Sequence, residues 1–100
     1  MSIYSFTFLL MSADRYTPLS NETITGDDAS HNLSIPSGTM MIFVTVEGGN
    51  CRYWFDGSTP TSSEGHQILA NEKEVFVGIN LTDYEIYVPT GAKAQVSYFQ

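Results

Sequence analysis

The sequence predicts an all-β fold, an antiparallel β-sandwich or barrel of the jelly-roll kind, with residues 1–100 forming a single domain. Roughly seven to nine short segments alternate apolar and polar side chains, as strands with one buried face do. Turn signals rich in Gly, Pro, Asn and Asp separate these segments about every eight to twelve residues. No window of about twelve residues keeps apolar side chains at the spacing of a helix face, so we expect no long helix.

The first strand is expected over residues 1–11, where large apolar side chains recur at every second position. The polar residues 12–31 are expected to be a long, exposed connection that can include one edge strand, with short extended pieces at 15–17 and 23–25. Another extended piece is expected at residues 32–35. The turn signal Pro36-Ser37-Gly38 follows it.

The most apolar segment, residues 40–46, predicts a strand buried on both faces. Residues 47–50, Glu-Gly-Gly-Asn, have the composition of a hairpin turn, and residues 51–55 form the expected return strand. Alternation along that strand places Cys51, Tyr53 and Phe55 on one face, and Arg52 and Trp54 on the other.

A long polar loop, residues 56–66, follows this hairpin and contains no apolar side chain except the ring of Pro60. Small β domains usually carry function on such loops, because the rigid strands hold them in place. The sequence therefore directs attention to this loop first.

Four more strands are expected in the second half of the chain, at residues 67–70, 75–79, 84–88 and 94–99. The turns between them are expected at residues 71–74, 80–83 and 89–91. In the last two strands, one face holds Tyr84, Ile86, Val88, Ala94, Val96 and Tyr98.

The chain has a net charge of −7, from eleven acidic and four basic residues. The cations are scattered, whereas nucleic acids and anionic membranes bind clustered basic side chains. We therefore expect no direct nucleic-acid binding and no membrane binding. The acidity favours solubility, and a partner with a basic patch is the sharper hypothesis.

No catalytic or metal-binding motif stands out, so we expect no enzyme activity, no cofactor and no metal site. Cys51 is the single cysteine and is expected to be a small core residue. The two imidazoles, His31 and His66, lack converging zinc ligands. Asp56 fits a turn-forming residue better than a calcium ligand, and residues 27–28 indicate a solvated loop.

Trp54 and Arg52 leave two interpretations open. Exposed aromatic side chains on a β-sandwich can stack on sugar rings, which would make the chain a carbohydrate-binding module. The alternative places Trp54 in the core or in a subunit interface. Arg52 is expected to anchor the loop through an ion pair with Asp56 and to contact Trp54 through a cation–π interaction.

The run CRYWFDGSTPTSSEGH, residues 51–66, resembles a signature of small all-β structural proteins of tailed bacteriophages. That signature is an apolar residue, Arg-Tyr, two residues, Asp-Gly, two residues, Pro-Thr, three residues and Gly-His. The chain departs from it at Cys51, where a branched aliphatic residue is commoner, and at Glu64. Neither departure touches Arg52, Asp56, Pro60, Thr61, Gly65 or His66.

This resemblance implies a capsid decoration (cement) protein or another head- or tail-associated protein. Such a protein is made in the host cytoplasm, joins the capsid surface of the virion, binds the major capsid protein and assembles as a homotrimer. The alternative is a carbohydrate- or receptor-binding module associated with the tail. The residues expected to bind the partner or to shape the loop are Arg52, Trp54, Asp56, Gly57, Pro60, Thr61, Gly65 and His66.

Physical chemistry gives these residues a role in loop shape. Asp56-Gly57 lets the backbone leave the strand through positive φ, Pro60 holds Thr59 extended, and Gly65 frees the backbone as the chain rejoins the sheet. On this interpretation only the loop tip, residues 58–64, needs to touch a partner, unless the polar residues 12–31 do so instead.

Overall fold

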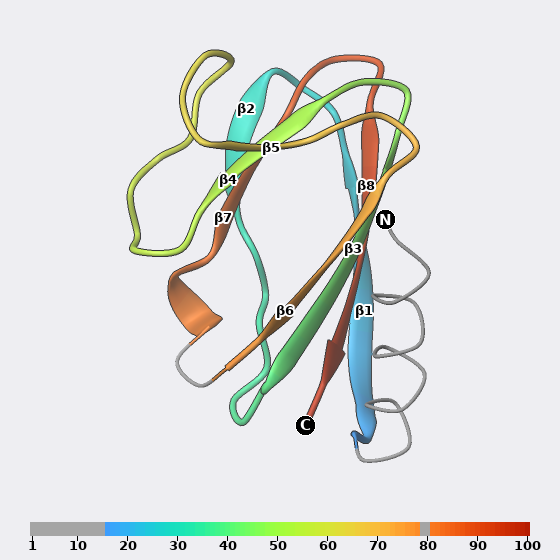
Figure 1. Ribbon diagram of the computed structural model, residues 1–100, viewed down its shortest axis with the longest axis vertical. Coiled ribbons are helices and arrows are strands. Elements are labelled where there is room, and N and C mark those ends of the chain that lie inside the picture. Colours follow the sequence, from blue (N-terminus) through green and yellow to red (C-terminus); the bar gives the residue numbers. More distant parts are fainter. Residues whose placement is uncertain (1–15, 79–80) are drawn as a thin grey trace.

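The computed structural model describes residues 16–78 and 81–100. Apart from one short 3-10 turn, η1 (Leu81–Asp83), all regular elements in these residues are strands, which confirms the predicted all-β class (Figure 1). The strands are β1 (Pro18–Thr25), β2 (Ala29–Asn32), β3 (Met41–Glu47), β4 (Cys51–Trp54), β5 (His66–Ile68), β6 (Lys73–Val77), β7 (Glu85–Val88) and β8 (Lys93–Phe99). The predicted strand at residues 1–11 lies outside the described residues.

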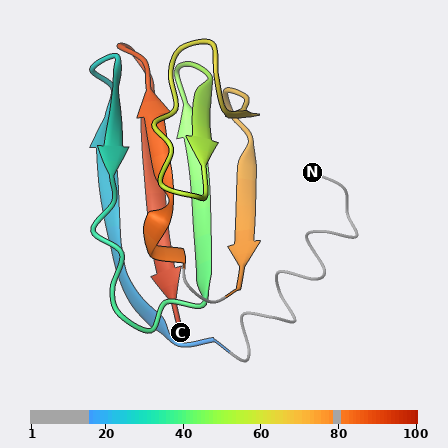
Figure 2. The ribbon, with the colours of Figure 1, turned by 90° about the vertical axis from the view of Figure 1, so that its left-hand side faces the viewer.

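The strands form two four-stranded antiparallel sheets, with the orders β1-β8-β3-β6 and β2-β7-β4-β5 (Figures 1 and 2). These orders are those of an eight-stranded jelly roll. The connections β1–β2, β3–β4, β5–β6 and β7–β8 each pass from one sheet to the other. Among the described strands, only β4 and β5 are both consecutive and paired, so they form the hairpin of this fold.

The hairpin predicted at residues 47–50 is therefore wrong, because β3 and β4 belong to different sheets. The connection is an arch whose glycines allow a close approach to the β7–β8 connection. A Cβ on Gly48, which has φ +80°, would lie 2.2 Å from the Gly91 carbonyl oxygen. The tight turn signal thus reports a backbone-to-backbone contact between two arches rather than a reversal within one sheet.

One hydrophobic core fills the space between the sheets. Val44 and Val96 reach it from the first sheet, and Ile86 and Val88 from the second. The predicted inner faces of β7 and β8 are confirmed, and Cys51 is fully buried, as expected. Residues 40–46 are less enclosed than predicted on their second face, because Phe43 and Thr45 are only half-buried.

Several predicted boundaries move. The polar residues 12–31 contain an eight-residue edge strand, β1, and most of β2, rather than mainly a loop. The extended piece predicted at 32–35 ends at Asn32. In β6 the inward side chain is Phe76, whereas Val77 is 48% exposed. The turns at residues 36–38 and 89–91 are confirmed by the hydrogen bonds Thr39 N to Pro36 O and Ala92 N to Pro89 O.

Candidate functional site

The candidate site is the β4–β5 hairpin with its loop, residues 55–65, and all eight residues singled out from the sequence belong to it. Figure 1 shows this loop projecting to the left of β4 and β7, on the outer side of the second sheet, and in Figure 2 it passes in front of that sheet. The hydrogen bonds described next hold it as a folded element on its own two strands.

Arg52 closes the base of the loop. Its Nη1 donates a hydrogen bond to the Gly65 carbonyl oxygen at 2.9 Å. Gly65 has φ +121°, and a Cβ on it would lie 3.1 Å from the Tyr53 carbonyl oxygen and 3.2 Å from the Arg52 Cβ. Glycine is needed here for both its conformation and its size. The predicted anchoring role of Arg52 is correct.

The predicted partner of Arg52 is wrong, because the Asp56 carboxylate is engaged within the loop. Its Oδ1 accepts a hydrogen bond from the Ser58 N–H at 3.0 Å. Hydrogen bonds from the Ser58 hydroxyl and N–H lower the pKa of Asp56. Asp56 therefore forms a local turn, and Gly57 completes it with φ +83° and an N–H that donates to the Asp83 carbonyl oxygen at 3.2 Å.

The second half of the loop is a closed turn around Thr61. The Thr61 N–H donates to the Glu64 carbonyl oxygen at 2.9 Å, and the Thr61 hydroxyl oxygen accepts from the N–H groups of Ser63 and Glu64. Pro60 is fully buried, whereas the other residues of the predicted tip at 58–64 are exposed. The apex of the loop is the exposed turn Ser62-Ser63-Glu64.

An aromatic cluster supports the start of the loop. The rings of Tyr53, Phe55, Phe76 and Tyr84 pack with centroid distances between 4.9 and 5.6 Å. Phe76 comes from the first sheet, so the cluster joins both sheets beneath the loop. Phe55 is its exposed member, with 41% of its surface accessible.

Tyr84 is the most enclosed ring of the cluster. Burial raises the pKa of its hydroxyl well above the ordinary value. Within the described part of the chain, this hydroxyl has no hydrogen-bond partner. Sequence reasoning did not connect these four rings, although the consecutive aromatic residues 53–55 were a signal that it could have used.

Trp54 lies on the outer face of the second sheet and is half-buried. It faces Glu85 of β7, itself only 9% exposed, and its ring contacts His66 edge-on at 5.2 Å. His66 also lies 5.4 Å from the Tyr53 ring. The motif residues Arg52, Trp54 and His66 are thus brought together at the base of the loop, away from its apex.

The Cys51 thiol is buried beneath this site. Burial raises the pKa of the Cys51 thiol to about 11, which keeps it protonated and unreactive at neutral pH. Within residues 16–78 and 81–100, no group of three or more His, Cys, Asp or Glu side chains is placed to hold a metal ion. No helix in these ranges is long and apolar enough to span a membrane.

The acidic pair of the β1–β2 connection is structural. Asp28 Oδ1 accepts hydrogen bonds from the Thr90 N–H at 2.8 Å and the Tyr87 hydroxyl at 3.4 Å, which joins two arches. Asp27 pairs with His31, with 2.8 Å between Oδ1 and Nε2. Both residues are exposed, as the predicted solvated loop requires, and these contacts fix the shape of that loop.

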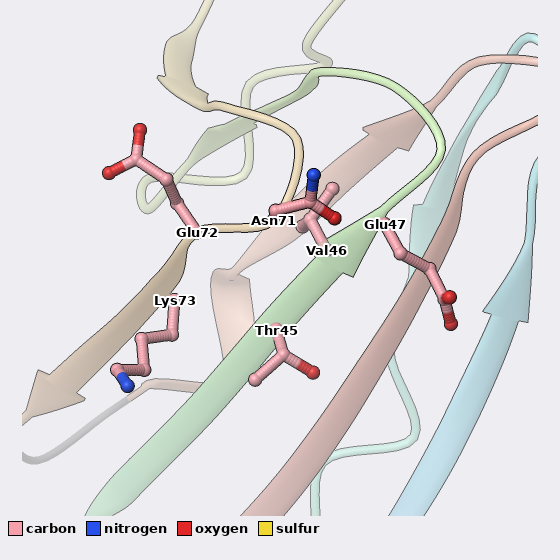
Figure 3. A pocket seen from close by; sticks show the side chains of 6 residues that line it. All are labelled: Thr45, Val46, Glu47, Asn71, Glu72 and Lys73. Carbon is pink, nitrogen blue, oxygen red and sulfur yellow. The ribbon is translucent and has the colours of Figure 1, made fainter.

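A shallow pocket of about 330 Å³ lies on the first sheet, away from the loop (Figure 3). It is open, and it includes none of the motif residues. It is formed at the end of β3 and the start of β6 by Thr45, Val46, Glu47, Asn71, Glu72 and Lys73.

No protein-family model, curated protein or solved structure matches this chain.

Proposed function

We propose that this chain is a non-enzymatic structural protein of a phage particle, a capsid decoration protein that binds the assembled major capsid protein and stabilises the head. The observation that carries the proposal is the folded state of residues 52–66. The motif that resembles phage structural proteins forms one hydrogen-bonded loop, tied at its base by Arg52 and Gly65 and at its apex by Thr61.

A loop of this kind suits a protein contact. Its apex is held before binding, so little conformational entropy is lost when a partner docks. The apex is small and polar, and Phe55 offers an apolar contact at the loop's start. The net charge of −7 favours a basic patch on the partner through electrostatic steering.

Binding to a capsid multiplies these modest contacts. An assembled shell offers many identical sites, so a protein that bridges neighbouring subunits gains avidity beyond that of a single contact. Bridging also opposes the outward pressure of packaged DNA, because a subunit can then move only if the bridge breaks.

Co-sedimentation with empty capsids tests the proposal. The capsids are assembled from the major capsid protein encoded nearest to this chain, and the wild-type chain is expected in the pellet at about micromolar concentration. Glu64→Lys reverses the charge at the apex and is expected to weaken binding at least about tenfold. The control Glu72→Lys makes the same change in the exposed β5–β6 connection and should bind like wild type.

If the wild-type chain stays in the supernatant, the decoration proposal fails. A folded Glu64→Lys variant that binds like wild type would instead move the contact away from the loop apex. Circular dichroism of each variant establishes that it is folded.

The second candidate function is a carbohydrate- or receptor-binding module of the tail, which the partly exposed rings of Trp54 and Phe55 favour. It predicts glycan binding that is lost in Trp54→Ala and Phe55→Ala. A glycan array probed with the wild-type chain separates the two functions, because a decoration protein gives no signal on it. Glu85 and His66 partly cover Trp54, so this candidate ranks second.

A further inference from the structure

The edge of the first sheet at β1 is the longest strand edge of the molecule's described part. β1 has 8 residues, whereas the other edge strands, β2, β5 and β6, have 4, 3 and 5. A sheet edge presents backbone N–H and C=O groups that can pair with another chain, and short edge strands limit this risk. β1 lacks that protection.

The hydrogen-bond pattern shows which residues of β1 face outward. The Gly26 N–H donates to the Ala92 carbonyl oxygen at 2.9 Å, in register with the β1–β8 pairing. In an antiparallel ladder, residues alternate between those that bond the neighbouring strand and those that do not. Counting back from Gly26, the residues whose N–H and C=O groups point away from β8 are Asn21, Thr23 and Thr25.

These outward groups are free in the described structure. Within residues 16–78 and 81–100, no hydrogen bond involves the backbone groups of Asn21, Thr23 or Thr25 on the open side, and all three residues are exposed. The β1 border of the first sheet is visible in Figure 1 beside β8. The strand is therefore a ready partner for another extended segment.

The edge of β1 also carries no outward-pointing charged side chain that would prevent pairing. Natural sheets often place Lys or Pro on exposed edges. Here Pro18 and the bulge between Pro18 and Ser20 interrupt only the start of β1. The one charged side chain, Glu22, points inward, where it accepts hydrogen bonds from the Tyr98 hydroxyl and from the Ser34 N–H at 2.9 Å.

We propose that a second copy of this chain occupies the edge, with the β1 strands of two copies pairing antiparallel about a two-fold axis at Thr23. In this register Thr23 faces its own counterpart, and Asn21 faces Thr25 of the other copy. All three pairs place outward N–H and C=O groups opposite each other, which gives about six new backbone hydrogen bonds. The side chains on the outer face are hydroxyls and amides, which form favourable cross-strand pairs.

A two-fold axis at Glu22 fits less well. It would place two carboxylates next to each other, and like charges directly opposite are destabilising. In that register Asn21 and Thr23 of one copy would face Thr23 and Asn21 of the other. Thr25 would face no outward-pointing backbone group. The register at Thr23 instead places each Glu22 opposite Ile24 of the other copy, where Glu22 keeps its contacts with Tyr98 and Ser34.

The pairing is expected to be salt-dependent. Each copy carries a net charge of −7, so two copies repel, and salt screens that repulsion. The pair does not depend on capsid binding. The β1–β1 pair can coexist with a three-fold contact on another face. Trimers would then associate in pairs through β1, and the smallest assembly would be a hexamer.

Analytical ultracentrifugation of the purified chain from roughly 10 µM to 1 mM tests the proposal. The wild-type mass is expected to double over this range. In high salt the doubling should occur at a lower protein concentration. Thr23→Pro removes an outward N–H that is not needed by β8, and Thr23→Lys adds a charge at the same place while keeping the backbone. Both are expected to stay at half the wild-type mass. Asn32→Lys is the matched control on the β2 edge and should dimerise normally.

Hydrogen exchange gives a second readout that a change in stability would not mimic. The amides of Asn21, Thr23 and Thr25 are expected to become protected only at concentrations where the mass doubles. A wild-type chain that remains a monomer, or forms a trimer with these amides unprotected, overturns the proposal. So does a folded Thr23→Lys variant that dimerises like wild type, which would point to another surface or to a segment of a different protein.

Discussion

Gly26 and Gly48 at the arch end differ from Gly57 in the β4–β5 loop in what an added side chain would meet. For Gly26 and Gly48 the limit is space. A Cβ on Gly26 would lie 1.9 Å from the Pro89 carbonyl oxygen, and one on Gly48 would lie 2.2 Å from that of Gly91. In the loop, Gly57 has φ +83°, but a Cβ on it would meet no atom within 4 Å, so only its conformation matters.

This difference distinguishes the arch end, where the backbone cannot move, from the loop apex, where the sequence can change. Backbones of three connections meet at the arch end, and no side chain can relax to make room there. The loop contacts the rest of the fold near its two ends and through Pro60, and it leaves its apex exposed. A binding loop can therefore change its tip without disturbing the strands that hold it.

The largest effect is expected at the arch end. Gly26→Ala forces a backbone shift against two carbonyl oxygens and should lower the free energy of unfolding by roughly 4 kcal/mol. Urea unfolding monitored by circular dichroism measures the loss. Gly91→Ala is the control for conformation alone, since its Cβ would meet nothing within 4 Å. It should cost roughly 1–2 kcal/mol, and equal losses in the two variants would contradict the comparison.

A smaller effect is expected at the loop base. Arg52→Met keeps the length of the aliphatic side chain but removes the hydrogen bond to the Gly65 carbonyl oxygen. We expect a loss of about 2 kcal/mol in unfolding free energy and faster proteolysis within residues 56–65. Lys93→Met removes the same charge from an exposed site on β8 and should change neither quantity. Cleavage at the wild-type rate in Arg52→Met would show that other contacts hold the loop.

The smallest effect concerns pH at the arch end. The Thr90 N–H donates to the Asp28 carboxylate and lowers the pKa of Asp28 below its unfolded value of about 3.9. A carboxylate with a lowered folded pKa contributes stability above the unfolded pKa and loses it as the pH falls through the folded pKa. Urea midpoints between about pH 2 and 6 should therefore fall less steeply in Asp28→Asn than in wild type. Ser62→Asn, at the exposed loop apex, changes no titratable group and should follow the wild-type curve. An Asp28→Asn curve parallel to that of wild type would contradict this prediction.

Local pattern predicted much of the fold because alternation reports which face of a strand meets the core. β7 and β8 follow this rule, with Ile86, Val88, Ala94 and Val96 buried. β1 does not, because its inward Glu22 is satisfied by Tyr98 and Ser34, which lie far away in the sequence or in another connection. A polar strand of this kind resembles a loop when only its composition is known.

The hairpin error and the Arg52 error have a shared physical cause. Gly48-Gly49 marks a tight backbone, but whether the chain turns within a sheet or crosses to the other depends on contacts with Gly91 and Ala92. Similarly, the loop residues were identifiable from the sequence, whereas the acceptor for Arg52 depended on where Gly65 returns to the sheet. Residue types predicted the members of the site, and only the three-dimensional path of the chain determines their partners.

The position of β8 also has a consequence for synthesis. β8 lies between β1 and β3, and the hydrogen bond from Thr23 to Gln95 spans 72 positions of sequence. The first sheet cannot close until residues 93–99 have left the ribosome, so β1 stays unpaired and β3 can pair only with β6 while the rest is made. We therefore expect slow folding governed by a late insertion, with the unpaired strands open to chaperone binding until β8 arrives.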